Sequence, residues 1–289
     1  MTAAAAFTGP GGFPLPGINP PRLGRTGPNV VARHLAERVR VATAGGDDVI
    51  VWRTRDNRLR RAEIGPRCWD LGMERSFPIR LEFRWPKRHA YSNERWCSHT
   101  GESLHCESML ERLVIMQLEY FFNGPGMPRI AAAATQPMLM LTDGRDRYPD
   151  IMLRLTDDRR LIIDAKPRAK MTDVVVANLA VTREVCQTVG WEYAVVHEPP
   201  KVVEYNLEML SSRRHPRFAP WPELRDAVRD QCLMPRPLGE VLDAISPVAR
   251  GNAISYVHNM MWNREIDPLT LREPLEWDSL VAATPREAT

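Results

Sequence analysis

The sequence predicts an α/β protein with a mixed β-sheet, followed by a smaller helical C-terminal domain. Between residues 91 and 196, helix-like periodicity alternates with short apolar segments that have the two-residue period of strands. From Trp221 the pattern changes to short amphipathic helices. At 289 residues the chain has room for about two domains. We expect four regions: a disordered arm over 1–28, a partly β basic region over 29–90, an α/β domain over 91–212 and a helical domain over 217–285.

Composition excludes some classes of protein. The chain is 44% hydrophobic and 26% charged, as in ordinary globular proteins. It has no apolar run near the ~18 residues that a membrane helix needs, and its start lacks the features of a secretory signal. Five scattered cysteines, an odd number, favour reduced thiols. We expect a cytoplasmic protein without membrane association.

The charge is unevenly distributed. Residues 1–96 carry 17 Lys and Arg against 9 Asp and Glu, although the net charge of the whole chain is only +3. Within this part, Arg84-Trp85-Pro86-Lys87-Arg88-His89 combines basic and aromatic side chains. That combination suits contact with a DNA backbone, and it suits equally an exposed loop pinned by its tryptophan.

The elements of the first region follow from local pattern. Residues 1–28 are rich in Pro and Gly, which predicts an unstructured arm. A short helix is expected over 30–41, and strands are expected over 48–53 and 59–64. Residues 79–83 alternate as a further strand.

A long amphipathic helix is expected next. Its apolar positions are Leu110, Leu113, Val114, Met116 and Leu118, and it ends near the Gly/Pro segment 123–126. Glu107 and Glu111 share one face of this helix, with Glu119 less squarely on it, and surface acids are the default explanation. Cys97, His99, His105 and Cys106 raise the alternative of zinc, but their spacing matches none of the usual structural zinc frameworks.

A β-hairpin follows a strand at 138–141. Apolar segments at 151–153 and 161–165 flank the turn residues Asp157-Asp158-Arg159-Arg160. If the turn is centred near Asp158, Asp150 comes level with Lys166, and Asp164 lies on the same face as Lys166. A helix over 172–189, ended by Gly190, and a strand over 191–196 complete this domain.

Two carboxylates and an ammonium group at one end of a hairpin have a chemical use. Mg²⁺ takes oxygen ligands and is often held by one or two carboxylates plus a substrate phosphate. A bound metal activates water, and a lysine can stabilise the charge that develops on the phosphate. Pro149-Asp150, about a dozen residues, then Asp164-x-Lys166 resembles the PD-(D/E)xK nuclease signature. The alternative is a solvated ion pair on an ordinary hairpin.

The C-terminal region suits a winged helix. Helices are expected over 221–233, 238–244 and 248–262, with a wing over 266–275. Residues 253–262 then occupy the recognition-helix place. Because this helix is not strongly basic, DNA binding and protein docking stay equally open.

Beyond the hairpin, the chain resembles TnsA-type endonuclease subunits of heteromeric transposases over roughly residues 90–210. The matching residues occur in the family's order: Ser98-His99-Thr100-Gly101, Glu107-Ser108-x-Leu110-Glu111, Leu118-Glu119-Tyr120, Gln136-Pro137, Pro149-Asp150-Ile151-Met152, Ile163-Asp164-Ala165-Lys166-Pro167, Gly190-Trp191 and Val195-Val196-x-Glu198. The winged-helix-like tail has a weaker likeness.

The resemblance implies a restriction-endonuclease-like PD-(D/E)xK nuclease domain over 91–212. Glu111, Asp150 and Asp164 would hold Mg²⁺, with Mn²⁺ as a substitute, and Lys166 would be the catalytic lysine. Some family members carry Gln at the place of Asp164, so the number of metal ions stays open.

It also implies a biological role. Such enzymes cleave the 5′ ends of a transposon, while an RNase H-like transposase subunit cuts and joins the 3′ ends under an AAA+ ATPase regulator. Two alternatives stay open at this point: a stand-alone defence or repair nuclease with the same site, and a winged-helix DNA-binding adaptor whose nuclease-like half is inactive.

Overall fold

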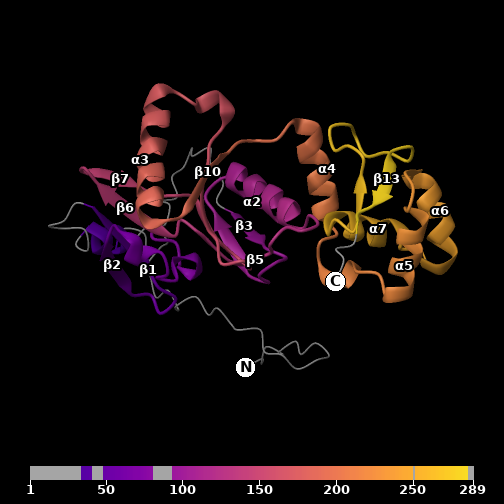
Figure 1. Ribbon diagram of the computed structural model, residues 1–289, viewed down its shortest axis with the longest axis horizontal. Coiled ribbons are helices and arrows are strands. Elements are labelled where there is room, and N and C mark those ends of the chain that lie inside the picture. The colour runs from indigo at the N-terminus through magenta and orange to yellow at the C-terminus, as the bar shows by residue number, and fades with distance from the viewer. Residues whose placement is uncertain (1–33, 41–47, 81–92, 250, 286–289) are drawn as a thin grey trace, which may run out of the picture.

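A computed structural model describes residues 34–40, 48–80, 93–249 and 251–285 of the chain (Figure 1). The expected arm over 1–28 and the basic and aromatic segment 84–89 lie outside these residues. Residues 34–40 are helical, inside the span expected for the first helix. In the ranges described, no helix combines the length and the apolar character needed to cross a membrane.

The first sheet is antiparallel and has the order β2-β1-β6-β7. Its central strands are apolar on both sides, because β1 packs between two clusters of the core. The strands expected over 48–53, 59–64 and 138–141 are therefore confirmed. The bounds are β1 Val49–Arg53, β2 Leu59–Glu63, β6 Met138–Thr142 and β7 Arg145–Arg147. A separate hairpin pairs β3 Asn93–Trp96 with β4 Ser103–Cys106.

The second sheet is mixed and has the order β10-β9-β8-β5, with β10 parallel to β9 and the other pairs antiparallel. Helix α2 precedes its first strand, and α3 connects β9 to β10. The expected α/β class with a mixed sheet is thus confirmed. The bounds are α2 Met109–Phe122, β5 Ile130–Thr135, β8 Ile151–Leu155, β9 Arg160–Ala165, α3 Asp173–Val189 and β10 Glu192–Val196.

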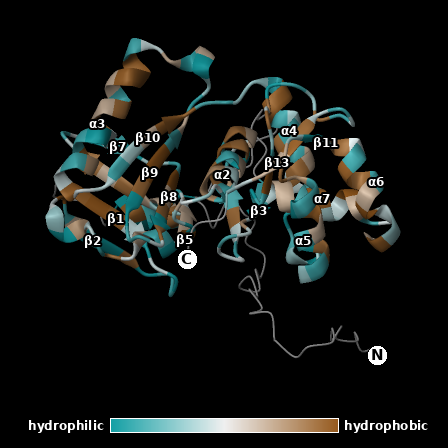
Figure 2. Cartoon of the chain, turned by 45° about the vertical axis from the view of Figure 1, so that its right-hand side comes forward, coloured by the Kyte–Doolittle hydropathy of each residue, from teal (hydrophilic) through white to brown (hydrophobic). Residues whose placement is uncertain are grey.

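Alternation along the strands gives this sheet two buried faces, and its strands are largely brown in Figure 2. Ile151 and Ile163 face α2, where they pack with Val114. Met152 and Ile162 face the other way, toward α3 and the first sheet. A residue's place in the alternation therefore decides which helix it meets.

The turn of the β8–β9 hairpin differs from the expected one. Asp158 adopts φ 72°, its N–H donates to Leu155 O at 3.1 Å, and Leu155 N–H donates to Arg159 O at 2.9 Å. This is a three-residue loop with a left-handed third residue, centred on residue 157 rather than 158. Because Ile151 pairs with Ile163, Asp150 comes level with Asp164, and Lys166 lies two residues further on. The register expected from the sequence is wrong by two residues.

The C-terminal part combines helices with a small sheet of order β11-β13-β12, at the far end of the molecule beyond α4 (Figure 1). Two expected boundaries are wrong: α6 continues to Ala249, and the next helix begins only after the chain turns at Gly251, φ 83°. The bounds are α4 Lys201–Ser211, α5 Pro222–Gln231, β11 Arg236–Pro237, α6 Leu238–Ala249, α7 Ala253–Trp262, β12 Ile266–Pro268 and β13 Leu280–Ala283.

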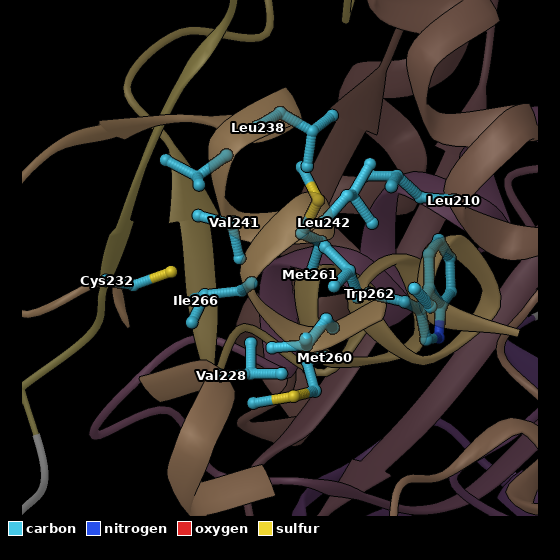
Figure 3. Packing of buried hydrophobic residues seen from close by; sticks show 14 of the residues in the cluster. Leu210, Val228, Cys232, Leu238, Val241, Leu242, Met260, Met261, Trp262 and Ile266 are labelled. Carbon is cyan, nitrogen blue, oxygen red and sulfur yellow. The ribbon is translucent and has the colours of Figure 1, made fainter. Parts of the chain in front are cut away.

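Helix α7 is a core helix. Met260, Met261 and Trp262 are fully buried and pack with residues of α4, α5 and α6 (Figure 3). The same cluster continues into α2 through Met116 and Tyr120, so one apolar core joins the α/β part to the helical part. Most of the surface of α7, the helix expected at the recognition-helix position, is therefore buried in the protein core.

Candidate active site

Three polar residues form a row across neighbouring strands. Thr135 pairs with Ile151, and Ile151 pairs with Ile163, so the adjacent residues Gln136, Asp150 and Asp164 lie at one level of the sheet. All three side chains are buried. The row lies where β5 ends, β8 begins and β9 approaches its end, so the pairing of the strands assembles it.

Asp150 and Lys166 are in direct contact. Lys166 Nζ donates to Asp150 Oδ2 at 2.9 Å, and the backbone N–H of Ala165 donates to the same oxygen at 2.8 Å. The other oxygen, Oδ1, receives Gln136 Nε2 at 3.5 Å, the upper limit for a hydrogen bond. The lysine reaches Asp150 along a diagonal, which its long side chain allows. The two side chains therefore meet as expected, although the strand register differs from the expected one.

Asp164 is completely buried and only half satisfied. Tyr193 Oη donates to its Oδ2 at 2.7 Å, and Arg147 Nη2 lies 3.6 Å from that oxygen. Its Oδ1 is buried without a hydrogen-bond partner among the described residues. Burial, and then the charge of Asp150, raises the pKa of the Asp164 carboxyl. A cation beside Oδ1 would favour the ionised carboxylate and so oppose the rise in pKa caused by burial and by Asp150.

Glu111 lies at the N-terminus of α2, where it forms a capping box with Ser108. Ser108 Oγ accepts from Glu111 N–H, and the Glu111 carboxylate accepts from Ser108 Oγ at 3.0 Å and from Glu107 N–H at 2.9 Å. Burial, and then the charge of Asp150, raises the pKa of Glu111 to about 7. Glu111 therefore stabilises the start of α2, and the charge of Asp150 acts on its carboxylate.

The neighbouring Glu107 forms an ion pair with Arg80. Arg80 donates to both of its carboxylate oxygens, at 3.2 and 2.7 Å, and the Arg80 guanidinium also stacks 4.9 Å from the centre of the Tyr148 ring. Both carboxylate oxygens of Glu107 are thus held by Arg80.

Not all the acids converge. The charge of Asp150 contributes to the raised pKa of both Glu111 and Asp164, but in the ranges that the structure describes no three Asp, Glu, His or Cys side chains surround a common point. The side chains that come together at this end of the strands are Asp150, Asp164, Lys166 and Gln136. The Glu111 carboxylate is turned to its helix cap.

The oxygen donors at the row nevertheless fit a hard cation. Asp164 Oδ1 and Gln136 Oε1 are buried without partners in the described part of the chain, and Asp150 Oδ1 has one long contact. Buried acceptors normally have donors, so a group of acceptors short of donors is unusual. Mg²⁺ or Mn²⁺, which bind oxygen ligands, would satisfy it.

No role at the site was predicted for Gln136, Tyr193 or Arg147. Gln136 and Asp150 are separated by two strands of the other sheet, so only the pairing of β5 with β8 makes them neighbours. A buried tyrosine and arginine beside an acid carry no local signal in sequence.

An exposed basic segment follows the site. Arg168 and Lys170 lie on a short 3-10 helix directly after Lys166-Pro167. Beside it, a groove of about 740 Å³ is lined by Arg168, His197 and Arg272 together with residues of α2 and β12. Positive side chains are thus within a few residues of Lys166.

The zinc alternative does not match the contacts of His99. Its Nδ1 accepts from Ile130 N–H at 3.0 Å, and its Nε2 pairs with Asn123 Oδ1 at 2.8 Å, so both ring nitrogens have protein partners. Cys97 is buried, and burial raises the pKa of its thiol. These residues pack the β3–β4 turn against α2.

Comparison of the chain with models of known protein families gives no match, and comparison with curated proteins gives no match either.

Proposed function

We propose that this chain is a metal-dependent endodeoxyribonuclease that cleaves the 5′ ends of a transposon as one subunit of a heteromeric transposase. The observation that carries the proposal is the contact between Asp150 and Lys166 beside buried oxygens of Asp164 and Gln136 that have no hydrogen-bond partner among the described residues. Buried acceptors without donors are unusual, and they are not expected beside an ordinary surface ion pair. The order helix, acid-bearing strands, helix and strand agrees with the restriction-endonuclease-like core that the sequence resemblance implies.

Each step of phosphodiester hydrolysis has a group available. Mg²⁺, when bound, supplies an activated water and offsets negative charge on the scissile phosphate. Asp150 and Asp164 would hold the ion through their Oδ1 atoms. Asp150 Oδ2 holds the Lys166 ammonium in place, and Lys166 would orient the water or stabilise the charge that develops during attack.

Glu111 would be the further acid of this site. Its raised pKa of about 7 reflects burial and the charge of Asp150. A divalent cation lowers the cost of ionising such a group. The same carboxylate caps α2, which ties the helix end to the site.

For the C-terminal domain, the element order α5, β11, α6, α7, β12 and β13 supports a winged-helix-like fold. We favour protein docking over DNA reading through α7, because Val257 and Met260 to Trp262 of that helix are buried in the internal core. The segment between β12 and β13 exposes Leu269 and Trp277, which suit a protein partner. The expected partners are the RNase H-like transposase subunit and the AAA+ ATPase regulator.

A cleavage assay tests the proposal. The purified chain is incubated with Mg²⁺ or Mn²⁺ and DNA carrying transposon ends, alone and with an RNase H-like transposase subunit. We expect metal-dependent 5′ cleavage that EDTA stops and that Asp150→Ala abolishes without loss of the folded far-UV spectrum. Full cleavage by a folded Asp150→Ala protein would overturn the proposal.

The same assay separates the alternatives. Efficient cleavage without any second protein favours a stand-alone nuclease. DNA binding without binding of Mg²⁺ or Mn²⁺ favours an adaptor.

A further inference from the structure

Gln136 occupies a position that its backbone alone does not explain. It adopts φ 48°, its N–H donates to Asp150 O at 2.9 Å, and its carbonyl accepts from Ile79 N–H at 2.8 Å. Any residue can make these two main-chain bonds, and the left-handed backbone favours Gly or Asn. The presence of a long polar side chain needs a separate reason.

That side chain is fully buried beside Asp150. Gln136 is 0% exposed, its Nε2 lies 3.5 Å from Asp150 Oδ1, and its Oε1 has no hydrogen-bond partner among the described residues. Burying an amide oxygen without a donor is costly. An apolar side chain would avoid this cost, so the amide oxygen is expected to serve something that binds there.

In both acids of the row, the two carboxylate oxygens differ in their hydrogen bonding. In Asp150 and Asp164, Oδ2 receives the donors, from Lys166 and Ala165 in one case and from Tyr193 in the other. Among the described residues, Oδ1 of Asp164 has no hydrogen-bond partner, and Oδ1 of Asp150 has only the 3.5 Å contact from Gln136 Nε2. Each acid thus has one oxygen held by the protein and one oxygen short of donors.

We propose that Gln136 is a ligand of the divalent cation, supplying its side-chain oxygen beside Oδ1 of Asp150 and Oδ1 of Asp164. The inference rests on the proposed function. The amide oxygen and nitrogen are interchangeable by rotation about the last side-chain torsion, so Oε1 reaches the place that Nε2 occupies beside Asp150. A neutral amide oxygen adds a ligand without adding a third buried negative charge to the row.

The competing role is that of a positioning residue, in which the Gln136 amide only donates to Asp150. Two substitutions separate these roles. Gln136→Met keeps the length and removes both polar atoms. Gln136→Glu removes the donor and keeps an oxygen that can bind a cation.

The experiment is calorimetric titration of the full chain with Mn²⁺ in the absence of DNA. For a ligand, we expect Gln136→Met to weaken Mn²⁺ binding at least about 10-fold and Gln136→Glu to bind as tightly as the wild type or more tightly. Equal weakening by both substitutions would mean a donor role and would overturn the inference. So would wild-type affinity in Gln136→Met.

Thermal melting supplies the control and a second readout. Gln187→Met, at an exposed position of α3, should leave both Mn²⁺ affinity and melting temperature unchanged. Gln136→Glu should melt lower than the wild type in EDTA, and Mn²⁺ should raise its melting temperature by more than it raises that of the wild type. A smaller rise would overturn the inference even if Gln136→Met failed to fold.

The outcome also separates this inference from the proposed function. A wild-type chain that binds no Mn²⁺ would defeat both. Wild-type binding with an unaffected Gln136→Met protein would defeat only the assignment of Gln136.

Discussion

Arg95 and Glu119 form an ion pair with both side chains almost completely excluded from water. The nitrogen-to-oxygen distance is 2.9 Å, and the side chains are 2% and 0% exposed. Glu119 also accepts hydrogen bonds from the backbone and hydroxyl of Ser98. The pair therefore joins β3 to α2, and it gives Glu119 a structural role, separate from the acids near Lys166.

Glu119→Ala should destabilise the protein strongly. Removing one partner of a buried pair leaves Arg95 as an uncompensated charge, at a cost of about 3–5 kcal/mol in the free energy of unfolding. Urea denaturation measures it. The control is Glu102→Ala, which breaks the half-exposed pair of Arg55 and Glu102 and should cost at most about 1 kcal/mol. Equal losses in the two variants would contradict a buried pair.

Lys166→Met should abolish most cleavage while the chain still binds Mn²⁺. The substitution removes the ammonium that would stabilise developing charge, which is worth about 100-fold or more in rate. Single-turnover cleavage kinetics and calorimetry measure the two effects. Lys201→Met, at an exposed site on α4, should cleave normally. A Lys166→Met protein with the wild-type rate would remove Lys166 from the mechanism.

Arg168→Ala and Lys170→Ala should weaken DNA binding in a salt-dependent way. Each exposed cation is placed to neutralise a phosphate beside the site. Each substitution should lower the slope of log affinity against log salt concentration by about 1. Fluorescence anisotropy at several KCl concentrations measures the slope. If neither variant differs from the wild type, the DNA backbone does not pass over this segment.

His258→Gln should remove part of the acid sensitivity of the fold. Burial in α7, and then the charge of Arg213, lowers the pKa of His258 from 6.5 to about 4. Between these pH values the unfolded chain binds a proton that the folded chain does not, so stability is full above pH 6.5 and is lost as the pH falls toward 4. The loss attributable to this group approaches about 3 kcal/mol at the low end.

Urea unfolding at pH 7 and pH 5 measures this effect. The difference between the two pH values should be smaller in His258→Gln than in the wild type. His34→Gln, at an exposed position, should keep the wild-type difference. An unchanged pH dependence in His258→Gln would show that the folded protein admits the charged imidazole.

Local pattern predicted the hairpin that carries the candidate site. The apolar segments around residues 157–160 predict the hairpin, and the reach of a lysine side chain is long enough that Asp150 and Lys166 meet despite the wrong register. The error of two residues came from Asp158, because a non-glycine residue in the left-handed conformation has a weak sequence signature. Gly190, in contrast, predicted the end of α3 correctly, since a glycine after the last helical turn is a strong stop signal.

The sequence by itself determined the elements with strong local periodicity, the acids beside Lys166 and the mixed α/β class, because periodicity and turn residues act over a few neighbouring positions. Only the tertiary structure decided that Gln136 joins Asp150 and Asp164 and that α7 is buried. These outcomes depend on pairing and packing between segments far apart in the chain, and no local preference specifies which distant partner a strand or helix face will meet.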